Sequence, residues 1–296
     1  MQARLIAYPP EQAATARTLA PGTPLSIGRA PDAILRIDHP SVSRAHAELH
    51  FDGAHWQLRD LGSKNGSFVD GIRVQQAALL RAGWLRFGDV YCEFAPLSDE
   101  EAAATEAGRQ ARRASVTART ARLDGLTRLE DLLDASLRGV VELAQCERGF
   151  VLLAQGDDFV VRASLALDPA RLSARSFSGS VGAIRRALAE RHSVVANDIG
   201  RDPWLAGRAS VIAAGLNALV TLPLFDGERA LGAIYADRMR PGPAITTLDL
   251  ELLEAFAETA SLWIAARRTS DLLSGEHAID GMPDWQAIVA ACEDAP

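Results

Sequence analysis

Residues 25–71 read LSIGRAPDAILRIDHPSVSRAHAELHFDGAHWQLRDLGSKNGSFVDG. Short apolar runs alternate in this stretch with turn signals such as Asp52-Gly53, Asn65-Gly66 and Asp70-Gly71. The runs that we interpret as strands are Leu25–Ile27, Ala33–Ile37, Ala45–Leu49, Trp56–Leu58 and, further on, Leu85–Phe87. Strands at this spacing, joined by Asx-Gly turns, predict an all-β sandwich.

Four short motifs follow one another at the predicted strand–loop junctions. They are Gly28-Arg29, Ser43-Arg44-Ala45-His46, Lys64-Asn65-Gly66-Ser67 and Asp70-Gly71. Each motif alone is a weak signal, since Asn-Gly is an ordinary hairpin turn. In this order, however, they closely resemble the forkhead-associated (FHA) domain over about residues 20–95. The resemblance implies a β-sandwich that binds phosphothreonine peptides through its loops.

The resemblance assigns a role to each polar residue of these motifs. A phosphothreonine carries close to two negative charges and several strong acceptors, and a guanidinium stays charged at any working pH. By resemblance, Arg29 supplies that cation, Ser43 adds a hydroxyl donor, and Arg44 and Lys64 lie beside the phosphate or the peptide backbone. Asn65 would hold the main chain of the peptide, because its amide both donates and accepts.

The remaining motif residues are expected to support the site. Ser67 is counted with the phosphothreonine-binding residues, at a supporting position where the family more usually has threonine. His46 would brace the loops without touching phosphate, and Gly28 and Gly66 would give structural support. The alternative is an ordinary solvated surface with a simple Asn-Gly turn, but all four motifs in register favour phosphate binding.

Residues 97–122 differ in composition from what precedes them. An acidic stretch gives way to arginines, alanine is abundant and large apolar residues are scarce. This composition predicts a charged, partly helical linker with too little apolar area to pack by itself. Arg112-Arg113-Ala114-Ser115 has the spacing that arginine-directed kinases accept, and Thr117 and Thr120 follow. A phosphorylated threonine here could engage the FHA domain of its own chain or of a dimer partner. The alternative is a solvated basic hinge.

The rest of the chain predicts an α+β domain with a helix at each end. Leucines at helical spacing indicate a first helix up to about Leu143. Further helices are expected at Val181–Glu190 and Thr247–Arg267. The expected strands are Gly149–Ala154, Phe159–Leu165, Val220–Phe225 and Leu231–Tyr235. The segments Ser193–Ile199, Asp202–Trp204, Leu222–Leu224 and Leu231–Asp237 together resemble a GAF domain over about residues 123–268. The predicted organisation is therefore a sandwich at 1–96, a linker at 97–122, a GAF domain at 123–269 and a polar tail at 270–296.

The resemblance leaves the ligand of the GAF domain open, because such domains bind diverse small molecules or simply dimerise. Candidate pocket residues are Asp198, Trp204, Arg208, Ser210 and Asn217, although Asn197 or Asp198 could equally cap a turn. No cofactor is predicted: the domain lacks lysine, Cys146 is poorly placed for bilin attachment, and His192 fits a surface or packing role. Surplus apolar residues on the terminal helices, namely Leu132, Leu143, Leu248, Leu262 and Ile264, suit either a homodimer or burial within the domain.

Composition restricts the function further. The net charge is −7, and an acidic chain is a poor non-specific binder of nucleic acid. No apolar run reaches the roughly 18 residues that span a bilayer, and the first residues lack a secretory signal, so a cytoplasmic protein without a membrane partner is expected. Three widely spaced cysteines indicate neither a disulfide framework nor a zinc site. No nucleophile–base pair or metal spacing stands out, so an enzyme is not expected.

Together these features predict a signal-transduction adaptor. It would bind a protein phosphorylated on threonine by a Ser/Thr kinase and couple this to a sensory or dimerising GAF domain. An alternative is the input half of a sigma-54-type transcription regulator system, since the GAF domain resembles those that precede such activator modules. The sole lysine, Lys64, excludes a phosphate loop of the GxxxxGK type, so that system would need an effector on another chain.

Overall fold

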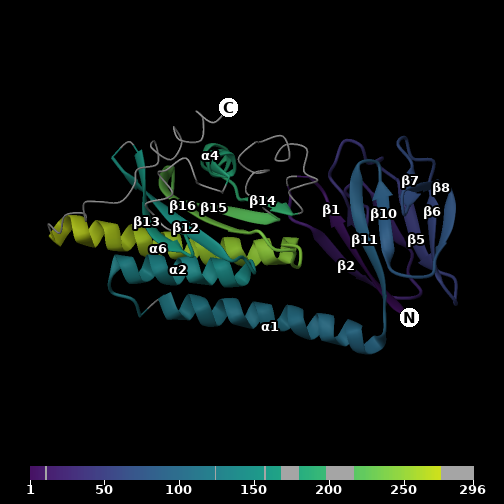
Figure 1. Cartoon of the computed structure of the whole chain (residues 1–296), viewed down its shortest axis with the longest axis horizontal. Helices are drawn as coiled ribbons and strands as arrows, with labels where there is room; N and C mark the ends of the chain where they lie inside the picture. Colours follow the sequence, from purple (N-terminus) through teal and green to yellow (C-terminus); the bar gives the residue numbers. More distant parts are fainter. Residues whose placement is uncertain (11, 124, 157, 168–179, 198–216, 275–296) are drawn as a thin grey trace. The chain divides into compact units, whose positions relative to one another are not determined.

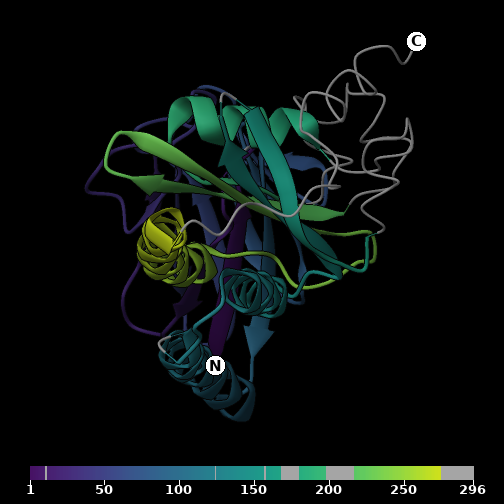
Figure 2. The same ribbon diagram turned by 90° about the vertical axis from the view of Figure 1, so that its left-hand side faces the viewer.

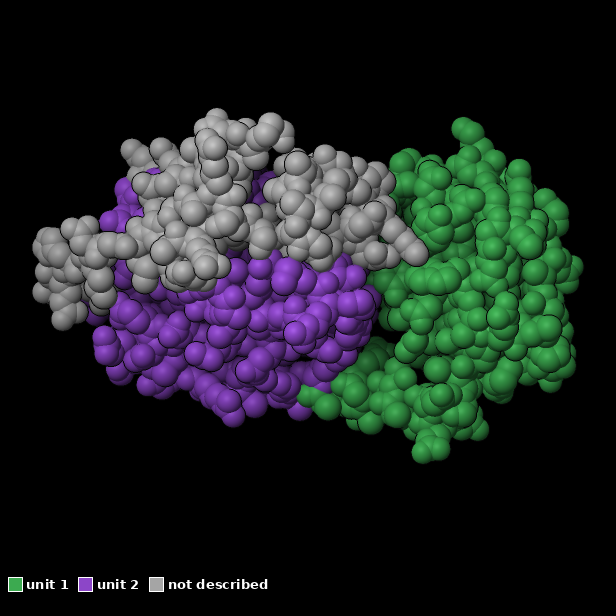
Figure 3. Space-filling model, in the orientation of Figure 1, with its two compact units in different colours: residues 1–111 green, residues 112–296 purple. Residues whose placement is uncertain are grey.

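The computed structural model describes residues 1–10, 12–123, 125–156, 158–167, 180–197 and 217–274, with side chains up to residue 270. The chain divides into two compact units, Met1–Ala111 and Arg112–Pro296 (Figure 3). Among the helices described, none has both the length and the apolar character that crossing a membrane requires.

The first unit is a sandwich of two β-sheets (Figure 1). One sheet has six strands in the order β2–β1–β11–β10–β7–β8, and the other has five in the order β4–β3–β5–β6–β9. The strands are β1 (Gln2–Tyr8), β2 (Thr15–Leu19), β3 (Leu25–Gly28), β4 (Leu35–Arg36), β5 (Ala47–Phe51), β6 (Trp56–Asp60), β7 (Ser67–Val69), β8 (Ile72–Val74), β9 (Gln76–Leu79), β10 (Gly83–Phe87) and β11 (Val90–Leu97). All pairs are antiparallel except β3 with β4. The predicted β-sandwich is confirmed.

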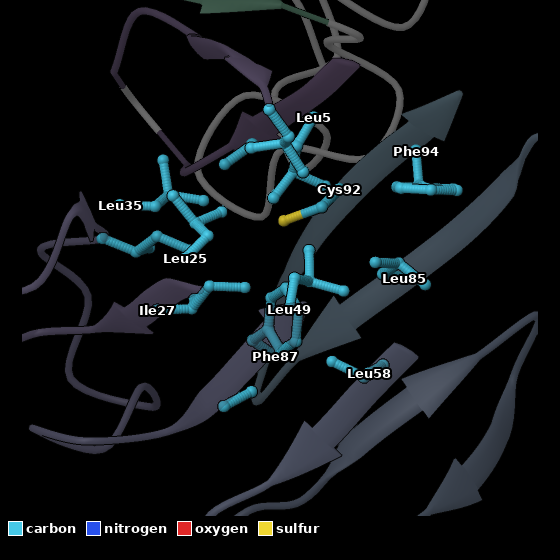
Figure 4. Close-up of a cluster of buried hydrophobic side chains, with 14 of the residues drawn as sticks. Leu5, Leu25, Ile27, Leu35, Leu49, Leu58, Leu85, Phe87, Cys92 and Phe94 are labelled. Atoms are coloured by element: carbon cyan, nitrogen blue, oxygen red, sulfur yellow. The ribbon is translucent and has the colours of Figure 1, made fainter. Parts of the chain in front are cut away.

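Alternate side chains of these strands fill the space between the two sheets (Figure 4). In β1, Ala3, Leu5 and Ala7 are fully buried, as the two-residue period of a strand requires. They belong to one cluster with Trp56 and Phe87, which are also fully buried. Each large side chain buried in this way stabilises the fold by about 1.5–3 kcal/mol. The core therefore fixes the strand ends from which the motif-bearing loops project.

The second unit has one antiparallel sheet in the order β13–β12–β16–β15–β14, with helices on both faces (Figure 2). Its elements are α2 (Leu129–Leu143), β12 (Arg148–Gln155), β13 (Asp158–Leu165), α4 (Val181–Glu190), β14 (Val194–Asn197), β15 (Ala218–Asp226), β16 (Arg229–Arg238) and α6 (Thr247–Ser274). Ile184 and Ala187 of α4 pack on one face of the sheet with Phe150 and Tyr235. Helices α2 and α6 pack together on the other face. The predicted α+β domain with a helix at each end is confirmed.

Helix α1 (Asp99–Leu123) occupies the region expected to be a linker, and the boundary between the units falls within it. Its start is a capping box: Glu101 N donates to Ser98 Oγ at 3.2 Å, and Ser98 N donates to Glu101 Oε2 at 2.8 Å. Acidic residues in its first turn and Arg122 in its last complement the helix dipole. The prediction of scarce packing is accurate, since the buried residues of α1 are Ala102, Val116 and Leu123. The sequence predicted only partial helix in this region, whereas the structure has one helix from Asp99 to Leu123.

The apolar surplus of the terminal helices is partly explained by burial within the second unit. Leu132 and Ile264 are 1% and 0% exposed, so they cannot contribute to a dimer surface. Leu262 is 72% exposed, whereas Leu143 and Leu248 are half-buried. Helix α6 also continues to Ser274, beyond the predicted end at Arg267.

Candidate functional site

Arg29 lies directly after β3, where the main chain fixes its position. Its N–H donates to Ser43 O at 2.9 Å, and the next residue, Ala30, donates to Arg44 O at 3.1 Å. The Arg29 Nε group makes a longer contact of 3.4 Å with Val42 O. The residue is exposed, and no carboxylate among the described residues forms an ion pair with it. Arg29 is therefore a positioned cation that remains available to an anion from solution.

Gly28 allows the backbones of β3 and of the loop before β5 to approach each other. A Cβ atom on Gly28 would lie 2.0 Å from Arg44 O and 3.2 Å from Ser43 O. Because these are backbone atoms, no side-chain rotation could relieve the overlap. The glycine therefore determines how closely Arg29 approaches Ser43.

We expect Gly28→Ala to displace the loop at Ser43 and Arg44. The overlap should lower the free energy of unfolding by about 1–3 kcal/mol and weaken any ligand that bridges Arg29 and Ser43. Urea unfolding of the full chain measures the first effect. Gly108→Ala is the matched control, because nothing lies within 4 Å of its added Cβ; equal destabilisation by both variants would contradict the prediction.

Ser43 presents its hydroxyl group between two loops. Its Oγ accepts a hydrogen bond from Lys64 N at 3.0 Å, so the hydroxyl hydrogen is left to donate. This contact also holds the start of the Lys64–Ser67 motif against the loop of Ser43. The side chains of Arg44 and Lys64 are exposed. The structure thus brings three cationic residues, Arg29, Arg44 and Lys64, to the loops around one hydroxyl group.

Asn65 is exposed and already uses part of its amide group. Its Nδ2 donates to Ser41 O at 2.7 Å, which leaves one N–H and the Oδ1 acceptor for a ligand. Ser41 is itself held, because its Oγ accepts from Asp89 N at 2.8 Å and contacts His39 Nδ1 at 2.7 Å. Sequence reasoning did not identify Ser41, which orients the Asn65 side chain.

His46 connects the two loops from inside the domain. Its side chain is fully buried; Nδ1 accepts from Ser43 N at 3.0 Å, and Nε2 lies 3.2 Å from Gly66 O. Since Nδ1 accepts, the hydrogen must be on Nε2 and is donated to Gly66 O. Burial lowers the pKa of His46, which keeps the ring neutral. This geometry agrees with a bracing role for His46, and Gly66 has a φ of +83°, which favours glycine.

A buried carboxylate, Asp60, organises the loop that carries Lys64 and Asn65. Its Oδ1 accepts from the N–H groups of Gly62 and Ser63, both at 2.9 Å. Its Oδ2 accepts from the hydroxyl groups of Ser63 and Ser67, both at 2.6 Å. Burial raises the pKa of Asp60, but these hydrogen bonds outweigh burial and lower it overall. The Asp60-x-Gly-Ser spacing, which suits an Asx turn, could have revealed this residue.

The same contacts change the role of Ser67. This residue is 0% exposed and its hydroxyl donates to Asp60, so it cannot reach a ligand at the surface. Its inclusion among the phosphothreonine-binding residues is therefore corrected: Ser67 supports the loop from below. Position 67 needs a hydroxyl group that donates to Asp60, and either serine or threonine provides one.

We expect Asp60→Asn to destabilise the first unit in a pH-dependent way. Asparagine Nδ2 cannot accept from the hydroxyl groups of Ser63 and Ser67. Each hydrogen bond to a charged group contributes about 1.5–3 kcal/mol to stability. The pKa of Asp60 is lower when folded than its ordinary value of 3.8, so its contribution is present above that value and is lost as the pH falls through the folded pKa.

The measurement compares urea unfolding of the full-length wild type and variant at neutral and acidic pH. The difference between them should be largest at neutral pH and should shrink below about pH 4. Asp89→Asn is the control, since the Asp89 side chain is exposed. A difference that does not depend on pH would contradict the role of the Asp60 carboxylate.

Most of the pocket residues predicted for the second unit lie outside the described residues: Asp198, Trp204, Arg208 and Ser210. Asn217 directly precedes β15, where its N–H donates to Arg238 O at 2.9 Å. Asn197 exchanges two hydrogen bonds with the backbone of Ile245, at 2.7 and 3.0 Å. Asn197 therefore joins the end of β14 to the segment before α6, which is a long-range structural role and not the turn cap expected as the alternative. His192 is exposed.

A buried polar network in the second unit escaped sequence reasoning. Asp237 is 0% exposed, and its two oxygens accept from Arg148 Nε at 2.6 Å and Nη2 at 3.2 Å. Tyr235 donates its hydroxyl to Asp237 at 2.7 Å and accepts from Ser180 N at 3.1 Å. Burial lowers the pKa of Arg148, but its bonds to Asp237 raise it overall. The network ties β12, β16 and the start of α4 together.

Comparison with known proteins agrees with this geometry. The FHA domain family matches residues 25–88 and the GAF domain family matches residues 128–264. The glycogen accumulation regulator GarA of Mycolicibacterium smegmatis is 36% identical over 77 residues, 25% of this chain and 49% of that protein. The FHA domain-containing protein FhaB of Mycobacterium tuberculosis is 36% identical over 74 residues, 25% of this chain and 48% of that protein. The chain thus spans about half the length of these relatives.

Solved structures match the first unit. The FHA-1 domain of Mycobacterium tuberculosis Rv1747 is 30% identical with a TM-score of 0.29, covering 32% of this chain and 97% of that one. A domain described for phosphothreonine-dependent FHA domain interactions is 28% identical with a TM-score of 0.31, covering 33% of this chain and 99% of that one. The two family matches show that the chain carries an FHA domain followed by a GAF domain.

Proposed function

We propose that this protein is a signalling adaptor that binds phosphothreonine peptides through the loops of its FHA domain. The observation that carries the proposal is the exposed Arg29 at the end of β3, whose main chain is bonded to the loop of Ser43, a residue with its hydroxyl hydrogen left to donate. The loops around it are locked from inside by His46 and Asp60. An exposed guanidinium and a hydroxyl donor on loops whose main chains are bonded together suit a phosphate dianion.

In this proposal, Arg29 and Ser43 donate to the phosphate, and Arg44 and Lys64 add positive charge at the rim. Asn65 offers its remaining N–H and its Oδ1 to the main chain of the peptide, because it can donate and accept at once. The loops need little rearrangement, since the hydrogen bonds of Ser41 and His46 already fix them. Such preorganisation lowers the entropic cost of binding. The phosphothreonine-dependent interactions named for one solved FHA structure support this ligand class.

The GAF domain is proposed to act as the sensory or dimerising partner of this reader, and the phosphorylated ligand would come from a Ser/Thr kinase. Exposed Leu262 on α6 is the residue of the apolar surplus that remains available for a homodimer. Sedimentation of the full chain at tens of micromolar tests dimerisation, and Leu262→Lys should shift any dimer towards monomer.

Coupling between the two domains predicts that peptide binding to the FHA domain alters hydrogen exchange in α2 or α6. Unchanged exchange in both helices would contradict the coupling.

Calorimetric titration of the full chain with phosphothreonine peptides tests the function. We expect saturable binding of a phosphothreonine peptide and none of its unphosphorylated counterpart. A peptide with glutamate in place of phosphothreonine should bind weakly at best, because a carboxylate offers one charge where the phosphate offers nearly two. A phosphothreonine peptide library in which no member saturates the protein would overturn the proposal.

A further inference from the structure

The second half of α1 meets α2 and α6 at a small pocket of about 90 Å³. Arg112, Ser115 and Arg119 line it from α1, and Glu142 of α2 and Asp249 of α6 line it from the opposite side. Figure 1 shows the C-terminal half of α1, which belongs to the second unit, alongside α2. All of these residues belong to the second unit. The pocket therefore has two cationic side chains and a hydroxyl on one wall and two carboxylates on the other.

The charged residues of the two walls are already paired. Arg112 Nη1 contacts Asp249 Oδ1 at 2.7 Å, and Arg119 forms an ion pair with Glu142. Asp249 is 5% exposed, and its second oxygen accepts from both the N–H and the hydroxyl of Thr246. These two ion pairs join α1 to the first turn of α6 and to the last turn of α2.

Ser115 lies between the two arginines on the same face of α1. Arg112 precedes it by three residues and Arg119 follows it by four, which is the spacing that brings helical side chains together. Arg119 Nε already donates to Ser115 Oγ at 3.2 Å. A group attached to this oxygen would thus be within reach of both guanidinium groups, and it would face both carboxylates.

This half of α1 is weakly held. Between residues 112 and 123, the buried apolar side chains are Val116 and Leu123. Arg119 and Glu142 are 26% and 54% exposed, and an ion pair that water reaches in this way contributes about 0–1 kcal/mol. In the other pair, a 38% exposed Arg112 contacts the nearly buried Asp249. A segment with so little buried surface opens locally at low cost, which would expose Ser115 together with the preceding Arg112-Arg113.

We propose that Ser115 is a phosphorylation site whose phosphate releases the second half of α1 from α2 and α6. In the modification step, Ser115 Oγ attacks the γ-phosphorus of ATP held by a Ser/Thr kinase. The new bond is Oγ–P, the bond to ADP breaks, and the hydroxyl proton passes to the base of the kinase. Arg112 and Arg113 would dock in an acidic substrate cleft of that kinase. The inference does not depend on phosphothreonine binding by the FHA loops.

The phosphate acts by competing for the two arginines. It carries nearly two negative charges and three strong acceptor oxygens, so it attracts Arg112 and Arg119 more strongly than Asp249 and Glu142 do. The same charge repels both carboxylates across the pocket. Asp249 keeps its hydrogen bonds from Thr246, so the start of α6 remains capped when Arg112 leaves. The expected result is a detached α1 beside an intact GAF domain.

The test uses the full chain with phosphoserine incorporated at position 115 during translation. Hydrogen exchange of residues 112–123 should become at least about tenfold faster than in the unmodified protein, while β12 and β16 stay protected. Phosphoserine at position 117 is the matched control, because Thr117 is exposed and lies outside the pocket; it should leave exchange near the unmodified rate. Unchanged or slower exchange with phosphoserine at position 115 would overturn the release.

A second measurement tests the modification itself. An arginine-directed Ser/Thr kinase and ATP should add one phosphate to the full chain at Ser115, as located by mass spectrometry. Ser115→Ala should abolish that phosphate, whereas Thr117→Ala should not. Phosphate that appears only on other residues, or none at all, would overturn the assignment of Ser115. Because neither measurement involves a phosphothreonine peptide, failure here is distinct from failure of the FHA proposal.

Discussion

Replacing Arg29 with alanine should weaken phosphothreonine-peptide binding about a hundredfold, which corresponds to roughly 2.7 kcal/mol. The variant loses the exposed guanidinium of the residue whose main chain is bonded to Ser43 O, and charged hydrogen bonds to phosphate are the strongest that such a site can make. Binding at the residual level would rely on Arg44, Lys64 and Asn65. Calorimetry or fluorescence anisotropy with a labelled phosphopeptide measures the change.

Two further variants separate charge from geometry. Arg29→Lys keeps the positive charge but loses the planar fork that matches phosphate, so its affinity should lie between those of the wild type and Arg29→Ala. Arg17→Ala is the control, because Arg17 is an exposed arginine on β2 and should bind as the wild type does. Arg29→Ala with wild-type affinity would mean that the phosphate does not bind at this residue.

The second large effect concerns stability. Asp237→Ala should lower the free energy of unfolding of the GAF domain by about 3–5 kcal/mol, because removing one partner of a buried ion pair is strongly destabilising. Arg148 is only 11% exposed and loses both of its bonds to the carboxylate. The Tyr235 hydroxyl loses its acceptor as well. Urea unfolding of the full chain, with hydrogen exchange to locate the unfolded unit, measures the loss.

The control for this variant is Asp226→Ala, which removes an exposed carboxylate at the end of β15. A double variant, Arg148→Met with Asp237→Leu, tests the mechanism more closely. Replacing both partners by apolar groups removes both buried charges, so the double variant should recover much of the loss. If Asp237→Ala unfolds like the wild type, or if the double variant is less stable than the single one, the charge argument fails.

Local patterns were sufficient to predict the two domains and the loops that carry the candidate site. The motifs around Arg29, Ser43 and Asn65 stand at strand ends, and the structure places them there. Residues whose role depends on distant partners were harder to find. Strand β1 has a clear alternation in Ala3, Leu5 and Ala7, but its main partner is β11, at the other end of the domain. Nothing local in residues 2–8 indicates that pairing.

Asp60 and Asp237 were missed for a related reason. An isolated acidic residue in a sequence usually lies in solvent, and only the fold shows that hydroxyl groups or a guanidinium surround it. The helix at residues 99–123 was underestimated because it has few apolar positions, although Ser98 and Glu101 form a recognisable capping box. Its attachment through Arg112 and Arg119 depends on carboxylates more than twenty residues away and could not be read from composition.

The single tautomer of His46 has a consequence for acidity. Burial lowers the pKa of His46, which favours the neutral ring, and guanidinium groups do not lose their protons in proteins. The positive charge that Arg29 and Arg44 offer therefore does not change on mild acidification. A phosphate ester, by contrast, takes up its second proton at about pH 6. The affinity for the phosphopeptide should therefore decline on acidification along the titration curve of the phosphopeptide. The ligand, and not the protein, then sets the lowest pH at which the two bind.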